Sequence, residues 1–499
     1  MSLEFPNEVW LHIFSLVSDG PSLKAIILSS RRFHDLALPE LLRSVGWNSA
    51  EKAEAHLDFF ERRVDCRKVP TRFALTLRFE GDTQSESVTT IVGRISWFAN
   101  LRTLSFTNAS LDGLFYTTLS QLPRLTDLSL DSCYLASPPL AVPPTPLQNS
   151  SPLAVNLDIP VTHLALTSLS TSQHTYSFYR DLLGLLRNVV SLTLTDQLPH
   201  LVDVLPALHS LSICASSDEG AASLLNRRYL PSIGSRLLHL RVNVQIALLD
   251  FRTTPVAPAQ LVELSAPLLQ SFRGSLYLAN CLIPTSPNLS SITISTVVKK
   301  TRDALALIEA VSAAPIEEIE LGVEDWDDEV LLGVTHRLPS CRQIKLFFYY
   351  SQPSDDFLFN LGIHHLPCLP HLHTLHVHVV PILPSPLLYD LRRRHYLPRT
   401  EETRIPAVEP EEEKCEEYLA VWKKYNPTLR AVKFVKGREW RREGEGGRWF
   451  VWSLEDVAEH EGDGVEEEIE EWFEDEDEGG GLVWESGADW EGEMDSEEA

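Results

Sequence analysis

The stretch NLRTLSF at residues 100–106 carries the spacing that decides the fold. An apolar residue, Leu101, is followed after two variable positions by Leu104 and after one more by Phe106. Alternation of this kind is typical of a short strand, since successive side chains of a strand point to opposite faces. The spacing therefore predicts a strand that buries Leu104 and Phe106 and leaves Ser105 on the opposite face.

The same spacing recurs along the middle of the chain. After Leu101, further copies begin at residues 125, 161, 189, 208, 237, 261, 289, 316, 341 and 372, and a degenerate copy with Leu75 and Leu77 precedes them. The mean interval of about 27 residues lies in the range of leucine-rich repeats, whose L-x-x-L-x-L stretch is a short strand. The sequence thus predicts an array of strand-containing repeats.

Amphipathic helices are expected before several of these strands. In residues 301–315, apolar residues recur at i, i+3, i+4 and i+7 from Ala304, which is the stripe of a helix with one buried face. Residues 88–100 and 176–188 behave alike. A helix–loop–strand unit cannot bury its own apolar face, so stacked units form a curved solenoid with strands along the concave side. A doubly wound sheet is the alternative, which the regular intervals and the lack of a nucleotide-binding loop disfavour.

The predicted fold class is α/β, and the chain divides into four regions. Residues 1–48 are expected to form a small helical module and residues 49–378 the leucine-rich solenoid. Residues 379–460 are expected to hold an insertion, a helix and strands that cap the open end of the solenoid, while residues 461–499 form an acidic tail. The Pro-rich stretch at residues 136–152 is expected to be a loop, because proline disrupts regular helix.

The acidic tail dominates the charge of the chain. The 499 residues carry a net charge of −27, and no Lys or Arg follows Arg448. Such a segment is expected to be disordered and to repel nucleic acids and anionic membranes. It serves either as a solubilising tail or as a docking segment for a basic partner. The second alternative is supported by aromatic residues that can act as anchors within the acidic run, namely Trp472, Phe473, Trp484 and Trp490.

Cysteine usage and hydropathy indicate a cytoplasmic or nuclear protein. The cysteines are odd in number and scattered singly: Cys66, Cys133, Cys214, Cys281, Cys341, Cys368 and Cys415. Neither a disulfide framework nor a zinc ribbon has this spacing. The first residues lack the basic region of a signal peptide, and no apolar stretch reaches the length of a membrane span.

Candidate binding residues lie at the outward positions of the predicted strands. The residues expected on the concave face are Thr103, Ser105, Asp127, Ser129, Thr374, His376 and His378. The last three belong to a histidine-rich run at residues 364–378, for which a metal site, a pH-sensitive binding patch and ordinary surface histidines are alternatives. No metal site and no cofactor is predicted, and no catalytic motif is present, so the chain is expected not to be an enzyme.

Three short helices are predicted in the first 45 residues. Pro6 is placed at the start of the first helix, where its missing N–H costs nothing. A unit of this size buries too little core to be very stable alone, so we expect it to pack on a partner or on the first repeat.

These residues resemble the F-box in the form common to fungal F-box proteins. The matching features are Pro6 and Glu8 in the opening motif, the pair Ile13–Phe14, Leu23 and Leu28, and SRRFHDLALP at residues 30–39. Phe5 stands where Leu is usual, and Ser30 where Cys is frequent. The resemblance implies that this segment binds the Skp-type adaptor of an SCF-type cullin–RING ubiquitin ligase, while the solenoid binds a protein substrate.

The resemblance also implies a set of adaptor-binding residues. They are Phe5, Pro6, Val9, Ile13, Phe14 and Val17, with Leu23, Ala25, Ile26 and Ile27 supporting or extending the patch. Spacing alone does not decide which of these side chains face outward. The alternative function is a leucine-rich scaffold protein outside any ligase, in which the three helices only cap the solenoid.

Overall fold

The computed structural model is described for a defined part of the chain. The described residues are 5–17, 20–76, 85–135, 159–167, 179, 182–195, 205–215, 218, 221–222, 225–226, 230–244, 264–349, 353–379, 412–435, 438–442 and 447–453. The Pro-rich stretch, the first part of the predicted 379–460 region (residues 380–411) and the acidic tail fall outside these ranges.

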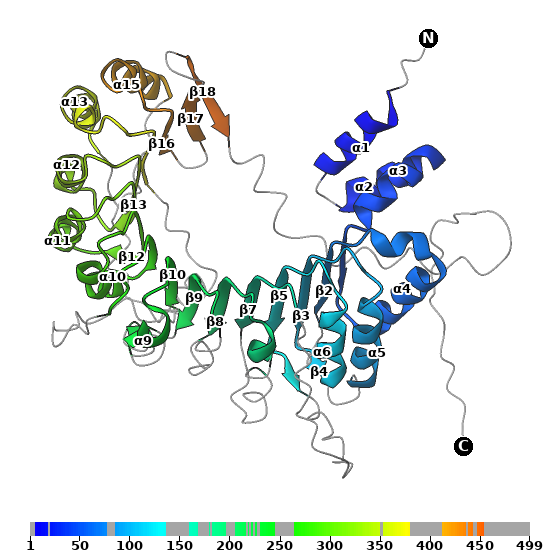
Figure 1. The fold of residues 1–499 in the computed structure, drawn as a ribbon. Coiled ribbons are helices and arrows are strands. Elements are labelled where there is room, and N and C mark those ends of the chain that lie inside the picture. The colour runs from blue at the N-terminus through cyan, green and yellow to red at the C-terminus, as the bar shows by residue number, and fades with distance from the viewer. Residues whose placement is uncertain are drawn as a thin grey trace, which may run out of the picture.

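One long sheet runs through the molecule, and the helices of the repeats lie on the outer side of its curve (Figure 1). Its strands, in spatial order, are β1 (Ser44–Trp47), β2 (Arg72–Thr76), β3 (Thr103–Thr107), β5 (Asp127–Asp131), β7 (His163–Thr167), β8 (Ser191–Thr195), β9 (Ser210–Ala215), β10 (His239–Val244), β11 (Ser271–Gly274), β12 (Ser291–Val298), β13 (Glu318–Val323), β14 (Gln343–Phe348), β15 (Thr374–Val379), β16 (Ala431–Val435), β17 (Arg438–Arg442) and β18 (Trp449–Ser453). A separate pair, β4 (Ser110–Leu111) and β6 (Tyr134–Leu135), lies outside it.

The strands follow the order of the chain, which is the arrangement of a solenoid. Neighbours from β1 to β16 pair in parallel, and only β17 and β18 are antiparallel. The helices are α1 (Asn7–Leu16), α2 (Gly20–Ser29), α3 (Arg31–Leu41), α4 (Ala50–Arg62), α5 (Ser85–Ile95), α6 (Gly113–Ser120), α9 (Leu230–Ile233), α10 (Leu276–Leu282), α11 (Thr301–Val311), α12 (Asp328–Arg337), α13 (Asp355–Asn360) and α15 (Glu412–Tyr425). Short 3₁₀ or π turns are η1 (Val64–Lys68), η5 (Ile283–Thr285), η6 (Leu361–His365) and η7 (Leu366–Cys368).

The repeat spacing predicted from the sequence builds the core. Leu101, Leu104 and Phe106 are fully buried, and the stripe of α11 that begins at Ala304 faces the core as expected. The chain is therefore an α/β leucine-rich-repeat-type solenoid, and the prediction of the fold class is confirmed.

The predicted position of the repeat at residue 261 is wrong. Its described part, residues 264–266, is not a strand, and the strand of this repeat is β11, eight residues beyond the predicted position. Gly274 occupies the third position of this motif, where the other repeats have an apolar side chain. The sequence pattern therefore does not reveal the repeat. A Cβ on Gly274 would lie 2.6 Å from the ring of Phe272, so this ring fills the space that the missing side chain leaves.

The parallel array extends beyond both predicted boundaries. Leu42, Val45 and Trp47 show the repeat spacing at the start of the array. They place β1 inside the region that was expected to be helical, and β1 pairs in parallel with β2. At the other end, Val432 and Phe434 of β16 are buried, and β16 pairs in parallel with β15. The 379–460 region thus contributes one more repeat before the antiparallel strands begin.

The last repeat is fixed by α15. Trp422 donates from its indole Nε1 to the Leu358 carbonyl at 2.9 Å, and its ring packs against the backbone of Gly362. Asn426, which is 2% exposed, donates to the carbonyls of Leu366 and Leu369, both at 3.0 Å. These bonds satisfy carbonyls that burial would otherwise leave unpaired.

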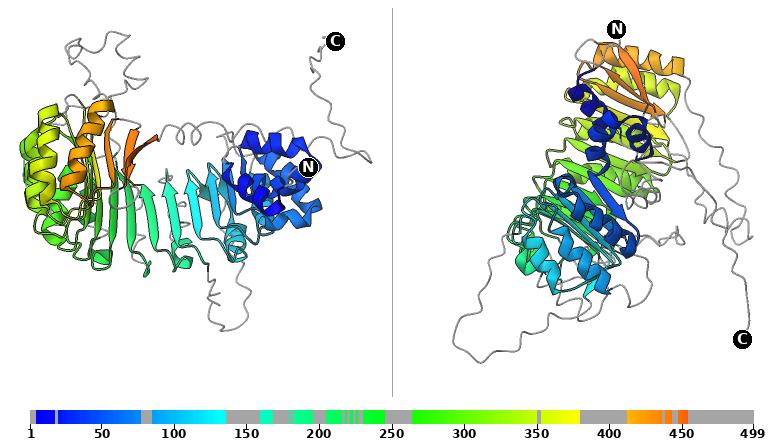
Figure 2. Two further views of the ribbon diagram at one scale, coloured as in Figure 1. Left: turned by 90° about the horizontal axis from the view of Figure 1, so that it is seen from above. Right: turned by 90° about the vertical axis from the view of Figure 1, so that its right-hand side faces the viewer.

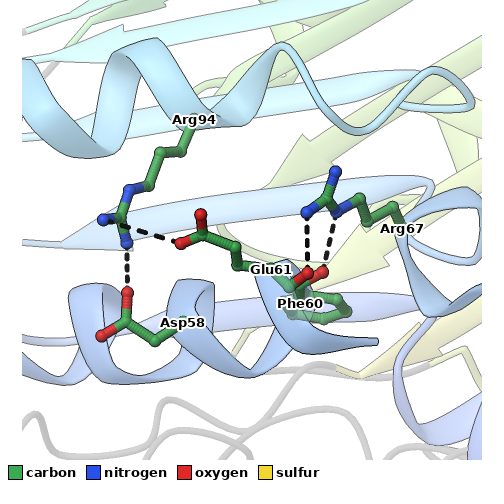
Figure 3. Close-up of polar contacts among 5 residues, drawn as sticks. All are labelled: Asp58, Phe60, Glu61, Arg67 and Arg94. Atoms are coloured by element: carbon green, nitrogen blue, oxygen red, sulfur yellow. Dashed lines mark hydrogen bonds and ion pairs between the residues drawn. The ribbon is translucent and has the colours of Figure 1, made fainter. Parts of the chain in front are cut away.

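Two arginines hold the first helices of the outer layer together (Figure 3). Arg94 of α5 forms ion pairs with Asp58 and, at 4.0 Å, with Glu61 of α4. Arg67 donates to the carbonyls of Phe60 and Glu61 at 2.8 and 2.9 Å, where the last carbonyls of α4 lack helical partners. The solenoid thus begins with a firmly packed unit of its own.

The first three helices form a second, separate core. Its buried members are Phe14, Leu23, Ile27 and Ala37, and none of them belongs to the core of the solenoid. The helices sit at one end of the arc, with α15 and β16–β18 at the other (Figure 2).

Candidate interaction surfaces

Helix α1 buries one face against α3. Pro6 is its N-cap residue, one position before the first helical residue, close to the predicted start. The rings of Trp10 and Phe14 lie 4.7 and 5.5 Å from that of Phe33 on α3. Ser30 caps α3 by accepting a hydrogen bond from the Phe33 amide at 3.2 Å, which gives a local reason for a hydroxyl where the F-box pattern often has Cys.

The opposite face of α1 is apolar and exposed. Val9 is 39% exposed, Ile13 38% and Leu16 70%, and their spacing of four and three residues places them in one row. Phe5, just before the helix, is 54% exposed. We call Phe5, Val9, Ile13 and Leu16 the α1 face. Exposed apolar residues gathered in this way are typical of a protein-interaction site rather than of free surface.

The predicted adaptor-binding residues divide into three groups. Phe5, Pro6, Val9, Ile13 and Ala25 are exposed; Val17 and Ile26 are half-buried; Phe14, Leu23 and Ile27 are buried in the helical core. Direct contact of Phe14 with a partner is not compatible with its 2% exposure, since the ring packs on Phe33 and supports the α1 face from behind. Leu16 is absent from the predicted set, although its spacing from Ile13 could have indicated it.

The segment before α1 is tied to α3. Arg32 donates to the Phe5 carbonyl at 2.9 Å and to the Asn7 side chain at 2.8 Å. The edge of the Phe5 ring also meets Trp10, with the ring centres 5.9 Å apart. Arg32 therefore places Phe5 at the end of the α1 face.

The second candidate surface is the concave face of the sheet. Thr103 pairs in register with Asp127, and Ser105 with Ser129, so these four predicted residues form one patch of partly exposed side chains. The middle of the sheet differs in character. The central position changes from Ser, Ala and Thr on β3 to β9 to Arg241 on β10 and Arg273 on β11, a change that the strand pattern alone did not reveal.

The histidines of β15 do not form an open binding patch. Thr374 remains partly exposed, but His378 is 6% exposed and its ring lies 5.0 Å from that of Phe347. His376 Nε2 lies 3.6 Å from Glu439 of β17, because the antiparallel strands beside β16 cover this end of the sheet. Burial lowers the pKa of His376 to about 4 and that of His378 to about 3, so both are neutral at pH 7.

The rest of the histidine-rich run lies elsewhere. His364 and His365 belong to η6, in the outer layer, whereas His376 and His378 lie on the sheet. Among the described residues, no three His, Cys, Asp or Glu side chains are grouped to hold a metal ion. No helix in the described ranges is long and apolar enough to cross a membrane.

Comparison with known proteins gives no family. No protein-family model and no curated protein matches the sequence. Among solved structures, a protein of Bacteroides fragilis is similar at 12% identity and a TM-score of 0.28, over 66% of this chain and 74% of that one. An internalin of Listeria monocytogenes is similar at 16% identity and a TM-score of 0.26, over 64% and 78%. The fold assignment therefore rests on the strand order and registers of this chain.

Proposed function

We propose that the chain is the substrate-recognition subunit of an SCF-type cullin–RING ubiquitin ligase, with the α1 face binding a Skp-type adaptor and the solenoid binding a protein substrate. The observation that carries this proposal is the exposed row Val9–Ile13–Leu16 on a helix whose other face is already packed. The resemblance of residues 3–45 to the F-box suggests the Skp-type adaptor as the partner of this exposed row.

Burial on a partner explains the composition of α1. Removing apolar surface from water contributes about 25 cal/mol per Å² to the free energy of binding. The side chains of the α1 face form such a surface on the helical module itself, outside the core of the solenoid. Arg32 and the buried Phe14, with the partly buried Trp10 and Phe33 packed on it, hold these side chains in place before binding. A pre-organised surface loses less conformational entropy on association.

The solenoid supplies the second half of the proposal. Its sheet offers a continuous concave surface whose exposed side chains change from repeat to repeat, which suits recognition of one protein partner. We propose no catalytic activity and no cofactor for it, and a location in the cytoplasm or nucleus.

A scaffold in which α1–α3 merely cap the solenoid is the competing function. A cap would be expected to merge its apolar side chains with the core that it covers. Here the two cores have no member in common among the described residues, and the α1 face is not part of either. This separation favours adaptor binding over capping.

The test compares two charge substitutions in the full chain. Ile13→Asp introduces a carboxylate into the α1 face, and Val190→Asp does so at an equally exposed position, 38%, in the solenoid. Calorimetric titration with a purified Skp-type adaptor should give micromolar or tighter binding for wild type and Val190→Asp, and at least a hundredfold loss for Ile13→Asp, the effect of about 2.7 kcal/mol. Unchanged circular dichroism establishes that the variants are folded. Equal affinity of Ile13→Asp and wild type would refute the proposed site, whereas loss of the solenoid fold in Ile13→Asp would favour the capping role.

A further inference from the structure

Two arginines stand side by side on the concave face, and no acidic residue in the described ranges pairs with them. Arg241 of β10 and Arg273 of β11 occupy directly paired register positions, and both are exposed. Like charges at paired positions of neighbouring strands repel each other. Arg241 donates to the Asn243 side chain at 3.2 Å, and neither arginine forms an ion pair with any described carboxylate.

The two directly adjacent strands, β9 and β12, place no negative charge beside the arginines. In the row that contains the two arginines, β9 places Ser212 and β12 places Thr293. Farther along this row come Glu320 of β13, which forms an ion pair with Lys345 of β14 at 3.7 Å, and then Lys433 of β16. An acidic ligand would relieve the repulsion between the arginines, since guanidinium groups bind carboxylates through paired hydrogen bonds.

The chain itself holds a segment of the matching charge. Residues 454–499 contain 22 Asp and Glu and no Lys or Arg, and the densest run is residues 466–478. The last described residue before this segment is Ser453 at the end of β18, on the same sheet as the arginines.

The length of the chain between Ser453 and the acidic run matches the distance to be covered. Seven strand intervals separate β18 from β11 and eight separate it from β10. At about 4.8 Å per interval, this is roughly 34 to 38 Å along the sheet. The thirteen steps from Ser453 to Glu466 span at most roughly 43 Å when extended.

We propose that the acidic segment at residues 466–478 docks within its own molecule on the concave face, with its carboxylates on Arg241 and Arg273. Docking of this kind makes the tail a competitor of any other acidic ligand of this face. The inference does not depend on adaptor binding, because the α1 face takes no part in it.

The experiment measures how fast a Glu-specific endoprotease cleaves the full chain after Glu474 and Glu476, followed by mass spectrometry. We expect cleavage in wild type to be about tenfold slower than in Arg241→Glu/Arg273→Glu at about 50 mM salt, since a tethered segment has an effective concentration near the millimolar range. The difference should vanish at about 0.5 M salt, where exposed charges are screened. Circular dichroism checks the fold, and Arg241→Gln/Arg273→Gln should show the same loss of protection without added negative charge.

Two further variants separate the site from general electrostatics. Arg102→Glu/Arg342→Glu reverses two other exposed arginines, one residue before β3 and β14, and should leave the protection intact. Replacing the five glutamates of residues 466–471 by lysine should restore protection in the Arg241→Glu/Arg273→Glu background.

Three results would overturn the inference. They are equal cleavage of wild type and Arg241→Glu/Arg273→Glu, an equal loss of protection in Arg102→Glu/Arg342→Glu, and protection that rises with protein concentration. The last result would assign the tail to a second copy of the chain rather than to its own concave face.

Discussion

The guanidinium of Arg32 donates a hydrogen bond to the backbone carbonyl of Phe5 at 2.9 Å, across 27 residues of sequence. This bond joins the segment that enters α1 to the helix that supports it from behind. The exposed ring of Phe5 thereby extends the row formed by Val9 and Ile13. The α1 face is therefore organised by a residue that need not touch the partner.

Arg32→Ala should weaken adaptor binding without unfolding the chain. Loss of these exposed bonds is expected to cost about 1 kcal/mol, or about fivefold in Kd, because the Phe5 segment must then be ordered on binding. Titration with the adaptor measures the change. Arg43→Ala is the matched control, since Arg43 pairs with Glu40 at 3.1 Å in the same region and is not bonded to Phe5. An equal loss in both variants would show that Arg32 has no special role.

Gly362→Ala should destabilise the C-terminal repeat. A Cβ at Gly362 would lie 2.1 Å from Cδ1 of Trp422, whose indole is fully buried and bonded to Leu358. Displacing a packed tryptophan is expected to cost about 2 kcal/mol or more. Gly184→Ala is the control, because Gly184 lies in a helical turn where an added Cβ would meet nothing within 4 Å, and it should gain about 0.5–1 kcal/mol. Urea unfolding measures the stability of both variants. A free energy of unfolding of Gly362→Ala equal to that of wild type would contradict the tight packing of Trp422 on Gly362.

Ser132→Gly should stabilise the protein. Ser132 follows β5 with φ of 52°, and Asn108 takes the same left-handed conformation, φ 57°, after β3. Asn tolerates this conformation better than Ser does, and a non-glycine residue pays about 1–2 kcal/mol for it. We expect a gain of about 1 kcal/mol in the free energy of unfolding. Ser129→Gly, in the extended backbone of β5, is the control and should lower the free energy of unfolding. If Ser132→Gly also lowered it, the contacts of the Ser132 side chain would outweigh the cost of its left-handed backbone conformation.

Acid should destabilise the fold well before the carboxylates titrate. Burial lowers the pKa of His56 to about 4, with Lys52 as a lesser cause, and the pKa of His376 and His378 is lowered similarly. Between pH 6.5 and about 4, the unfolded chain binds protons that the folded chain does not, so the free energy of unfolding falls as pH falls. The slope is up to about 1.4 kcal/mol per pH unit for each histidine.

Urea unfolding at pH 7.5, 6.0 and 5.0 measures this slope. His56→Asn should reduce it, since the Asn Oδ1 can still accept from the Trp47 indole, which donates to His56 Nδ1 at 2.5 Å. Equal stability at pH 7.5 and 5.0 would contradict the burial of these histidines.

The sequence predicted the fold because the repeat spacing is a direct consequence of strand geometry. It failed at two repeats: Gly274 replaced the third apolar residue and hid the repeat of β11, and the first strand keeps the spacing through Val45 and Trp47 but was assigned to the helical module. It did not assign the faces of α1, because Phe14 and Ile13 are adjacent and equally apolar, and only packing on Phe33 decides which is buried. The pairing of Arg241 with Arg273 depends on register between strands, which no local pattern contains.

The most direct test of the central claim is the mass of the species formed when the full chain, 56.2 kDa, is mixed with a purified Skp-type adaptor and passed through size exclusion with light scattering. We expect a single peak whose mass is the sum of one chain and one adaptor, and we expect Ile13→Asp to abolish this peak. Two separate peaks at micromolar concentration, with the chain folded, would contradict adaptor binding and leave a leucine-rich interaction protein with a helical cap.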